Sequence, residues 1–201
     1  MILPLTYYGN PVLRAESEEV TEFGDALEKL AEDMVETMRD ENGIGLAAPQ
    51  VGLSKRFFVV ELRPAKGEAQ DFELILDGKP VPAELAMPMA FANAEIELLD
   101  GEDVVCREGC LSFPGIRGEV VRREHVLVKF RDVRGNARTL ECTGMLARCV
   151  QHENDHCLGI VFVDRMSSRD RLRNASKLKS LKRDTLAELR EARRTPAADG
   201  E

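Results

Sequence analysis

The clearest chemical signal in the sequence lies at residues 151–156, which read Gln-His-Glu-Asn-Asp-His. His152 and His156 are four residues apart, so on a helix both imidazoles lie on one face and can bind the same divalent metal ion. Glu153 would lie beside the remaining position on the ion, where a carboxylate can take a proton from water. Only three histidines occur in the chain, so their placement around a glutamate favours a metal-dependent hydrolytic site over a polar helix surface.

Two histidines do not complete a catalytic metal site, which usually has three protein ligands and one open position. A metalloprotease of the metzincin type would have a third histidine at position 162, where this chain has Phe162. Cys110 is a better candidate, because it lies in a run bracketed by Gly and Pro, and a thiolate is a good ligand for Fe²⁺ or Zn²⁺. The residues alone leave open the alternative that Cys110 is a buried apolar side chain.

A third segment, residues 43–50, reads Gly-Ile-Gly-Leu-Ala-Ala-Pro-Gln. Its small side chains allow the backbone to approach a ligand closely. Gln50 ends the run with an amide that can donate a hydrogen bond. Taken alone, the run is also consistent with a plain loop or with the start of a strand.

The elements that would position these residues indicate an α+β fold. Residues 25–38 repeat apolar side chains at helical spacing, which predicts a helix with Asp25 as its N-cap and Gly43 beyond its end. A second helix, from Thr143 to Gly159, would carry the histidine motif. Strands are predicted over residues 57–62, 72–76, 95–99, 125–130 and 137–142, the last two joined as a hairpin by a turn at 132–136.

Strands followed by helices, without regular alternation, predict mixed or antiparallel sheets packed around a central helix that carries the histidine motif. One further helix is expected near each end of the chain. We expect a catalytic domain over residues 1–166, with a surface insertion at about 63–92 that is rich in Pro and Gly. A basic C-terminal helix would follow over residues 167–194, and residues 195–201 would form a flexible tail.

The overall composition is that of a globular protein. The chain has 201 residues, of which 43% are hydrophobic and 32% charged, and it lacks the roughly 18-residue apolar run that a membrane span needs. Its first residues show neither the basic nor the apolar region of a secretory signal. Five cysteines at irregular spacing predict free thiols or metal ligands rather than a disulfide framework. These features favour a cytoplasmic protein with no membrane partner.

Charge is distributed unevenly along the chain. Residues 167–194 contain ten Lys or Arg and four Asp or Glu residues, a net charge of +6, although the whole chain has a net charge of −8. A basic segment on an acidic body predicts a separate electrostatic role for that segment. A solvated helix face would explain the same composition, and nothing in it indicates recognition of a particular nucleic acid sequence.

Together, the three runs resemble the motifs of the peptide deformylase family, metal-dependent hydrolases that remove the formyl group from the N-terminus of new bacterial proteins. The matching residues are 43–50, 108–112 and 151–156, and the similarity extends over about residues 1–166. The resemblance implies that the substrates are nascent peptides beginning with N-formylmethionine, from which formate is released. Because such peptides emerge at the ribosome, whose surface is rich in phosphate, we expect the basic C-terminal helix to bind there.

The resemblance also implies one divalent metal ion, generally Fe²⁺, with Zn²⁺, Ni²⁺ or Co²⁺ as replacements. The implied ligands are Cys110, His152 and His156, with water as the fourth. Glu153 is implied to be the general base and acid. The side chain of Gln50 and the backbone N–H of Leu111 are implied to hold the oxyanion.

Around this centre, the resemblance implies that Glu108 and Arg122 form a charge-linked pair that holds the second motif. It places Arg117 near the bound peptide. We expect the substrate main chain to pair with residues 43–45, which include Gly45. Met145 and Cys149 precede His152 on the same helix face, so an apolar slot for the methionine side chain is predicted. Its lining would be Ile44, Met145, Cys149 and the ring of His152.

Two other functions fit parts of the sequence. A metallopeptidase would use the same histidine motif, but the downstream third ligand is missing. A non-enzymatic protein, stabilised by a metal and binding RNA or the ribosome, would need Cys106 or Cys142 as a fourth ligand in place of water. The chain also departs from the family pattern, because the insertion at 63–92 is longer than usual and Arg148 stands where some relatives have an apolar residue.

Overall fold

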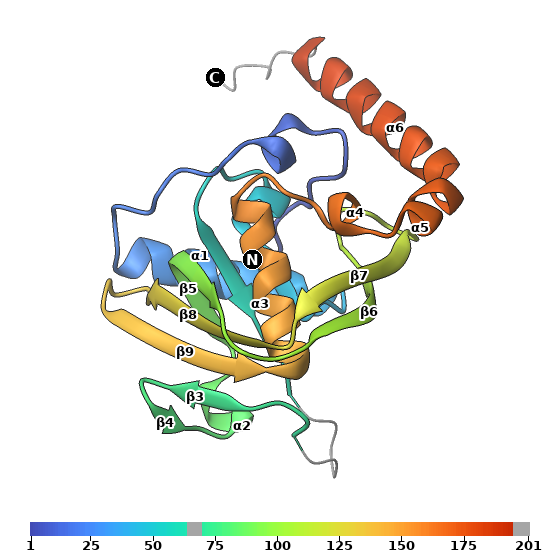
Figure 1. Cartoon of the computed structure of the whole chain (residues 1–201). Coiled ribbons are helices and arrows are strands. Elements are labelled where there is room, and N and C mark those ends of the chain that lie inside the picture. The colour runs from blue at the N-terminus through green and yellow to red at the C-terminus, as the bar shows by residue number, and fades with distance from the viewer. Residues whose placement is uncertain (64–69, 195–201) are drawn as a thin grey trace, which may run out of the picture.

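The computed structural model describes residues 1–63 and 70–194, and Figure 1 shows how their elements are arranged. The flexible tail predicted at residues 195–201 lies outside this described part, as do residues 64–69 of the predicted insertion. Within the described part, every helix is too short or too polar to cross a lipid bilayer.

A seven-stranded sheet lies at the centre of the molecule, with the strand order β1-β2-β5-β8-β9-β3-β4 and antiparallel pairing throughout. Its strands are β1 (Gly45–Ala47), β2 (Phe57–Val60), β3 (Leu74–Leu76), β4 (Lys79–Pro80), β5 (Met89–Leu98), β8 (His125–Arg131) and β9 (Ala137–Thr143). The hairpin predicted at 125–142 is confirmed, and it pairs His125 with Thr143 at one end and Arg131 with Ala137 at the other. The sheet order leaves β1 at one edge.

Helices cover both faces of β2, which explains why all four of its residues are buried. Phe58 and Val60 belong to the same apolar cluster as residues of α3 (Gly144–Cys157). Phe57 and Val59 point to the other face and pack in a second cluster with residues of α1 (Asp25–Asp40). The predicted α+β class is therefore confirmed, with α3 packed on the central sheet (Figure 1).

The remaining helices are η1 (Pro11–Arg14), η2 (Ala48–Val51), α2 (Ala83–Ala86), α4 (Phe162–Arg165), α5 (Ser168–Arg173) and α6 (Ala175–Arg194). Two predictions about helices are wrong. The N-cap of α1 is Gly24, and Asp25 is the first helical residue, where its carboxylate still favours the positive end of the helix. The basic segment forms two helices, because the side-chain amide of Asn174 donates to the carbonyls of Asp170 at 2.9 Å and Arg117 at 3.0 Å where α5 ends.

A second, two-stranded sheet was not predicted from the sequence. It consists of β6 (Asp103–Gly109) and β7 (Arg117–Arg123), which pair along their whole length. The buried positions of β7 are Gly118, Val120 and Arg122, and a glycine and a charged residue on the buried side hide the alternation that normally marks a strand. The pairing of β6 with β7 ends at Gly109 and Arg117, so the next residue of the chain, Cys110, lies directly after the end of this small sheet.

The prediction that residues 63–92 form a surface excursion is wrong for most of the described part of this stretch. The strand predicted at 72–76 is confirmed as β3, but the stretch also contains β4, α2 and the start of β5. Its apolar side chains belong to the same buried cluster as α3; they are Phe72, Leu74, Ala83, Met87, Met89 and Phe91. The physical reason is that β3 pairs with β9, with Leu74 opposite Cys142, so the Pro and Gly residues separate short packed elements.

The C-terminal helix α6 is packed against the body of the protein. Leu178 and Leu181 contact a cluster that contains Leu13 and Phe113. Gly9 lies so close to α6 that a Cβ atom there would be 2.9 Å from the carbonyl oxygen of Lys182. The helix therefore has a fixed position, while the prediction that residues 1–166 form a catalytic unit by themselves stays a prediction.

Candidate metal centre and active-site cleft

Three side chains from two distant parts of the sequence converge, two of them on α3 and one from the residue after β6. The ligand atoms of Cys110, His152 and His156 all lie within 4.8 Å of one another. Cys110 Sγ is 3.3 Å from His156 Nε2, and the two imidazole rings have centroids 5.2 Å apart. The helix supplies the two rings one turn apart, and the end of β6 supplies the sulfur. This donor set of two nitrogens and one thiolate fits a borderline-soft divalent metal ion.

The two imidazoles are held in different ways. His152 Nδ1 lies 2.9 Å from Glu108 Oε2, which leaves Nε2 to face the sulfur of Cys110. Burial lowers the pKa of His152, but hydrogen bonds with Cys110 and Glu108 raise it to about 10, so a metal ion has to displace a proton there. Burial places the pKa of His156 well below its ordinary value. Its Nδ1 has no hydrogen-bond partner within the described chain, and its Nε2 points at the thiol, so an uncharged His156 could bind a metal ion through Nε2.

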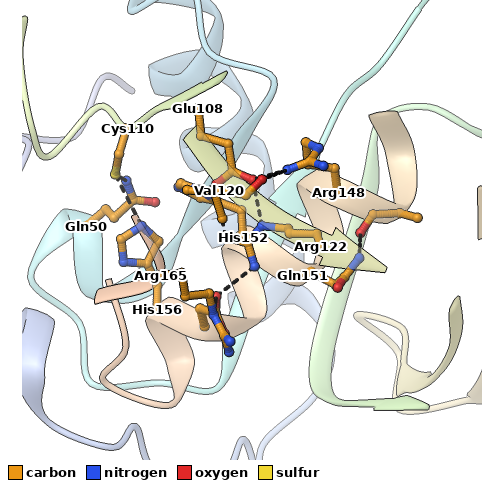
Figure 2. A network of polar contacts seen from close by, with 12 residues as sticks. Gln50, Glu108, Cys110, Val120, Arg122, Arg148, Gln151, His152, His156 and Arg165 are labelled. Atoms are coloured by element: carbon orange, nitrogen blue, oxygen red, sulfur yellow. Dashed lines mark hydrogen bonds and ion pairs between the residues drawn. The ribbon is translucent and has the colours of Figure 1, made fainter. Parts of the chain in front are cut away.

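Glu108 is the centre of a buried polar network (Figure 2). Arg122 donates to it at 2.6 and 3.0 Å, and Arg148 donates at 2.7 Å. Burial by itself would raise the pKa of Glu108, but hydrogen bonds from His152 and Arg122 hold it well below its ordinary value. The carboxylate is therefore charged, and it can fix the ring orientation of His152, as such partners do in metal sites.

The network continues along α3 away from the cleft. Arg122 Nη1 donates to Asp155 at 2.8 Å, and Arg165 donates to the same carboxylate at 2.6 Å through two nitrogens. Figure 2 shows Arg122 between Glu108 and Arg165. Because Asp155 lies next to His156, this second carboxylate ties β7 and α4 to the helix turn that carries the histidines.

Glu153 lies in the same turn and is almost completely buried. Burial raises the pKa of this carboxyl group to about 7, and its Oε2 has no hydrogen-bond partner among the described residues. The backbone of β1 approaches it closely, since a Cβ atom at Gly45 would be 2.5 Å from Glu153 Oε1. A carboxyl group with such a pKa can both accept and return a proton near neutral pH.

The amide of Gln50 has a defined orientation. Its Oε1 accepts a hydrogen bond of 2.8 Å from the backbone N–H of Ala47, so Nε2 points toward Cys110 Sγ and Ser112 Oγ, each 3.4 Å away. The backbone N–H of Leu111 has no acceptor within the described residues. Two N–H donors are thus present beside the sulfur of Cys110.

A cleft of about 620 Å³ opens onto this centre. Its walls include all of the residues for which a substrate contact was predicted: Ile44, Gly45, Arg117, Met145 and Cys149. Ile44 and Met145 are 44% and 42% exposed, so they stand at the mouth, whereas Cys149 is buried in the wall. The structure therefore brings these side chains together with Gln50 and Glu153 around one cavity.

Sequence reasoning missed two parts of the centre. Arg148 was noted only as a departure from the family pattern, and Asp155 was not considered as a partner of Arg122. The available signal for Arg148 was a charged residue on a helix stretch that is otherwise apolar, between Ala147 and Cys149. Cys106 and Cys142, the alternative fourth ligands, are not in the group formed by Cys110 and the two histidines in the described residues.

A cleft that opens onto a group able to hold a divalent metal ion, beside a buried carboxyl group, is the arrangement expected of a metal-dependent hydrolase. The model of the polypeptide deformylase family matches residues 2–172. The chain therefore belongs to the peptide deformylase family and is an enzyme of that type.

Individual relatives agree with this assignment. The chain is 44% identical to peptide deformylase of Opitutus terrae, over 93% of this chain and 96% of that protein. It is 43% identical to the enzyme of Salinibacter ruber, over 84% and 82% of the two chains. Among solved structures, that of the Thermus thermophilus enzyme has a TM-score of 0.76 at 35% identity, covering 92% of this chain and 99% of the other. A Synechococcus elongatus enzyme solved in complex with actinonin gives a TM-score of 0.71 at 35% identity, covering 91% and 85%.

Proposed function

We propose that this enzyme hydrolyses the formamide bond of peptides that begin with N-formylmethionine, releasing formate and a free amino terminus. The observation that carries the proposal is the convergence of Cys110, His152 and His156 with the buried Glu153 at the closed end of one cleft. The metallopeptidase alternative has no support in the geometry. Phe162, at the position of a metzincin ligand, is buried with its ring 6.0 Å from that of His152.

Cys110, His152 and His156 would hold one divalent ion, and Fe²⁺ is the proposed metal, with Zn²⁺, Ni²⁺ or Co²⁺ as replacements. The mixed thiolate and imidazole donor set supports this choice. When bound, such an ion acts as a Lewis acid and acidifies water. Glu108 supports the site by fixing the tautomer of His152, since its carboxylate occupies Nδ1 and leaves Nε2 for the metal. Arg122 keeps that carboxylate charged and in place.

Glu153 is proposed to move the protons. It accepts one from the attacking water and returns it to the departing amine, and a pKa raised by burial suits both transfers. Negative charge that develops on the formyl oxygen would be stabilised by Gln50 Nε2 and the backbone N–H of Leu111. Removal of one such donor typically costs about 10²–10³ in rate.

The cleft is proposed to hold the peptide by its main chain and by its first side chain. β1 is an edge strand, so the backbone of residues 43–45 can pair with an extended peptide by strand addition. Ile44, Met145 and Cys149 would surround the methionine side chain, and Arg117 would lie beside the residues that follow it. The Cβ contact at Gly45 explains why the smallest residue is required next to Glu153.

The decisive experiment measures formate release from formyl-Met-Ala-Ser by anaerobically prepared, Fe²⁺-loaded enzyme. The Glu153→Ala variant, with its metal content shown to be equal, serves as the control, and its rate is expected to fall by about 10²–10⁴. Absence of formate with the wild-type enzyme, or equal rates for the two proteins, would show that the proposal is wrong.

Helix α6 of the basic C-terminal segment is proposed to bind the ribosome, and a cytoplasmic location is proposed with it. Lys179, Lys182 and Arg190 are exposed side chains of α6 that could contact phosphate. Their replacement by glutamine should weaken cosedimentation with ribosomes at low salt and leave formate release from free peptides unchanged. Equal cosedimentation of the variant and the wild-type protein would contradict this role.

A further inference from the structure

A second pocket adjoins the active-site cleft where β6 ends and β7 begins. It has a volume of about 220 Å³, and we call it the exit pocket. Its lining residues are Arg107, Gly115, Arg117, Asp170, Arg173, Asn174 and Lys177. Three of these, Arg107, Gly115 and Arg117, also line the cleft, so the two cavities share a wall. A chain that leaves the cleft past these three residues enters the exit pocket.

The exit pocket carries an excess of positive charge. Four of its side chains are cationic, and the only carboxylate is that of Asp170. Arg107 and Arg117 form no ion pair with any described residue, and Arg173 has only a contact of 3.5 Å with Asp170. Asp170 accepts a hydrogen bond of 2.9 Å from the backbone N–H of Glu119 through its other oxygen. Arg107, Arg117 and Lys177 are left without a carboxylate partner in the described chain, and the four cations exceed the one carboxylate by three charges.

Contacts between the helices and the cleft hold the pocket in shape. Lys177 Nζ donates to the carbonyl of Gly115 at 3.0 Å, and the side chain of Asn174 donates to the carbonyl of Arg117 at 3.0 Å. Figure 1 shows α5 and the start of α6 beside the start of β7, the strand that begins with Arg117. The basic C-terminal segment thus forms one wall of the path along which a peptide would leave the cleft.

We propose that the exit pocket binds acidic side chains of the substrate peptide, downstream of the first two residues, and thereby selects among formylated peptides. This inference rests on the proposed function, because it takes the occupant of the cleft to be a peptide. The shared wall favours the substrate itself over a nucleic acid, because a peptide that already lies in the cleft can continue past Arg107, Gly115 and Arg117 into the pocket. The C-terminal segment then has a role in substrate choice, carried by Arg173 and Lys177.

Exposed ion pairs contribute modestly, so the expected preference is about threefold to tenfold for two acidic residues at low salt. It should shrink as salt rises, because the screening length falls from about 10 Å at 0.1 M to about 3 Å at 1 M. The position of the acid along the peptide should also matter, since the first residue lies in the apolar part of the cleft.

The test uses two fluorescent, unformylated peptide amides, Met-Ala-Ser-Asp-Asp and Met-Ala-Ser-Asn-Asn, which resemble products and are bound without being consumed. Dissociation constants are measured by fluorescence anisotropy with metal-loaded full-length enzyme. The Asp-Asp peptide should bind more tightly. In the double variant Arg173→Gln/Lys177→Gln, the ratio of the two dissociation constants should fall to less than half of its wild-type value. The control is Lys182→Gln/Arg190→Gln, which removes two positive charges from α6 outside the pocket. In this control the wild-type ratio should be retained.

Equal dissociation constants for the two peptides would overturn the inference, as would an equal loss of preference in the two double variants. If the enzyme binds the two peptides equally but binds short oligouridylate through Arg173 and Lys177, the pocket is a site for polyanions and not for the substrate. Formate release is measured in parallel with formyl-Met-Ala-Ser. Release of formate together with equal dissociation constants refutes this inference alone, whereas a preference without any formate release refutes the proposed function alone.

Discussion

Arg148 donates a hydrogen bond of 2.7 Å to Glu108, the same carboxylate that lies 2.9 Å from the ring nitrogen of His152. Arg148 also donates to the backbone carbonyls of Val104, at 2.6 Å, and Val120, at 3.1 Å. It therefore links the two strands of the small sheet to the carboxylate that orients a metal ligand. Its side chain is buried, so each of these contacts is shielded from water.

We predict that Arg148→Leu weakens metal binding without removing any ligand. Glu108 keeps Arg122 but loses one of its donors, and loss of such supporting contacts typically reduces metal affinity by about 10–100-fold. Two carbonyls also lose a partner, so the free energy of unfolding should fall by about 1–3 kcal/mol. Metal affinity is measured by competition with a chelator, and Arg148→Lys, which keeps the charge, should recover part of it. Unchanged metal affinity in a destabilised variant would limit Arg148 to a structural role.

Gly45→Ala should lower kcat while the protein stays folded. The new methyl group would lie 2.5 Å from Glu153 Oε1 and 2.8 Å from Cys149 Sγ, so the carboxylate has to move. The backbone of β1 pairs with β2 and cannot yield as easily as the end of a side chain. A displacement approaching 1 Å at a catalytic group can cost about 10²-fold in rate. Steady-state kinetics and thermal unfolding test this, and an unchanged kcat in the folded variant would contradict the close approach of Gly45 to a catalytic carboxylate.

The histidine spacing was sufficient to predict one part of the centre. A helix places residues four apart on one face, so the position of His152 relative to His156 follows from local geometry alone. The position of Cys110 does not, because its sulfur is brought to the histidines by the pairing of β6 with β7 and by the packing of β7 on α3. The residues made Cys110 a candidate for the third ligand but left open a buried apolar role, and the resemblance to the family implied that it is a ligand.

The resemblance implied the pair of Glu108 with Arg122, but the rest of the network around Glu108 could not be predicted from the sequence for a related reason. Arg122 and Arg148 are buried charges, and a reading of apolar periodicity treats such residues as breaks in an element. Each is satisfied by a carboxylate that comes from another element, which a local pattern does not contain. The same effect hid β7, whose buried side includes Arg122. Alternation between apolar and polar side chains did reveal β8 and β9, because all of their buried positions are apolar.

We predict a pH-dependent stabilising contribution from Glu61, which joins the end of α1 to the end of β2. Arg39 donates to it at 2.6 and 2.8 Å, and Arg63 lies 2.9 Å away. The hydrogen bonds from Arg39 lower the pKa of Glu61 below its ordinary value of 4.5. The contribution is therefore complete above pH 4.5 and is lost as the pH falls through the lower folded-state pKa.

The change Glu61→Gln should accordingly reduce the free energy of unfolding by about 1 kcal/mol at pH 7, since Arg39 is largely exposed and the pair is partly screened. The difference from the wild-type protein should shrink as the pH falls below 4.5 and through the lower folded-state pKa. Thermal unfolding of both proteins at several pH values measures it. Glu22→Gln, at an exposed glutamate with no ion pair in the described chain, is the matched control and should show no difference at any pH. A difference for Glu61→Gln that stays constant with pH would contradict the assignment.

The five cysteines should separate by reactivity in the native protein. Burial raises the pKa values of Cys142 and Cys157 to about 12 and that of Cys149 well above its ordinary value, so at pH 8 these thiols remain protonated and shielded. Cys106 and Cys110 are partly exposed. Because the thiolate is the form that reacts with iodoacetamide, we predict that Cys106 is modified in every preparation and that Cys142, Cys149 and Cys157 are not.

The behaviour of Cys110 in this experiment tests the metal centre directly. If Cys110 binds the metal together with His152 and His156, its sulfur is shielded in the metal-loaded enzyme and becomes reactive once a chelator has removed the ion. Peptide mapping by mass spectrometry gives the extent of modification at each cysteine, and Cys106 serves as the internal standard in both samples. Equal modification of Cys110 with and without metal would exclude it as a ligand. Because modification is a chemical property of the sulfur, this result does not depend on whether a suitable substrate has been chosen.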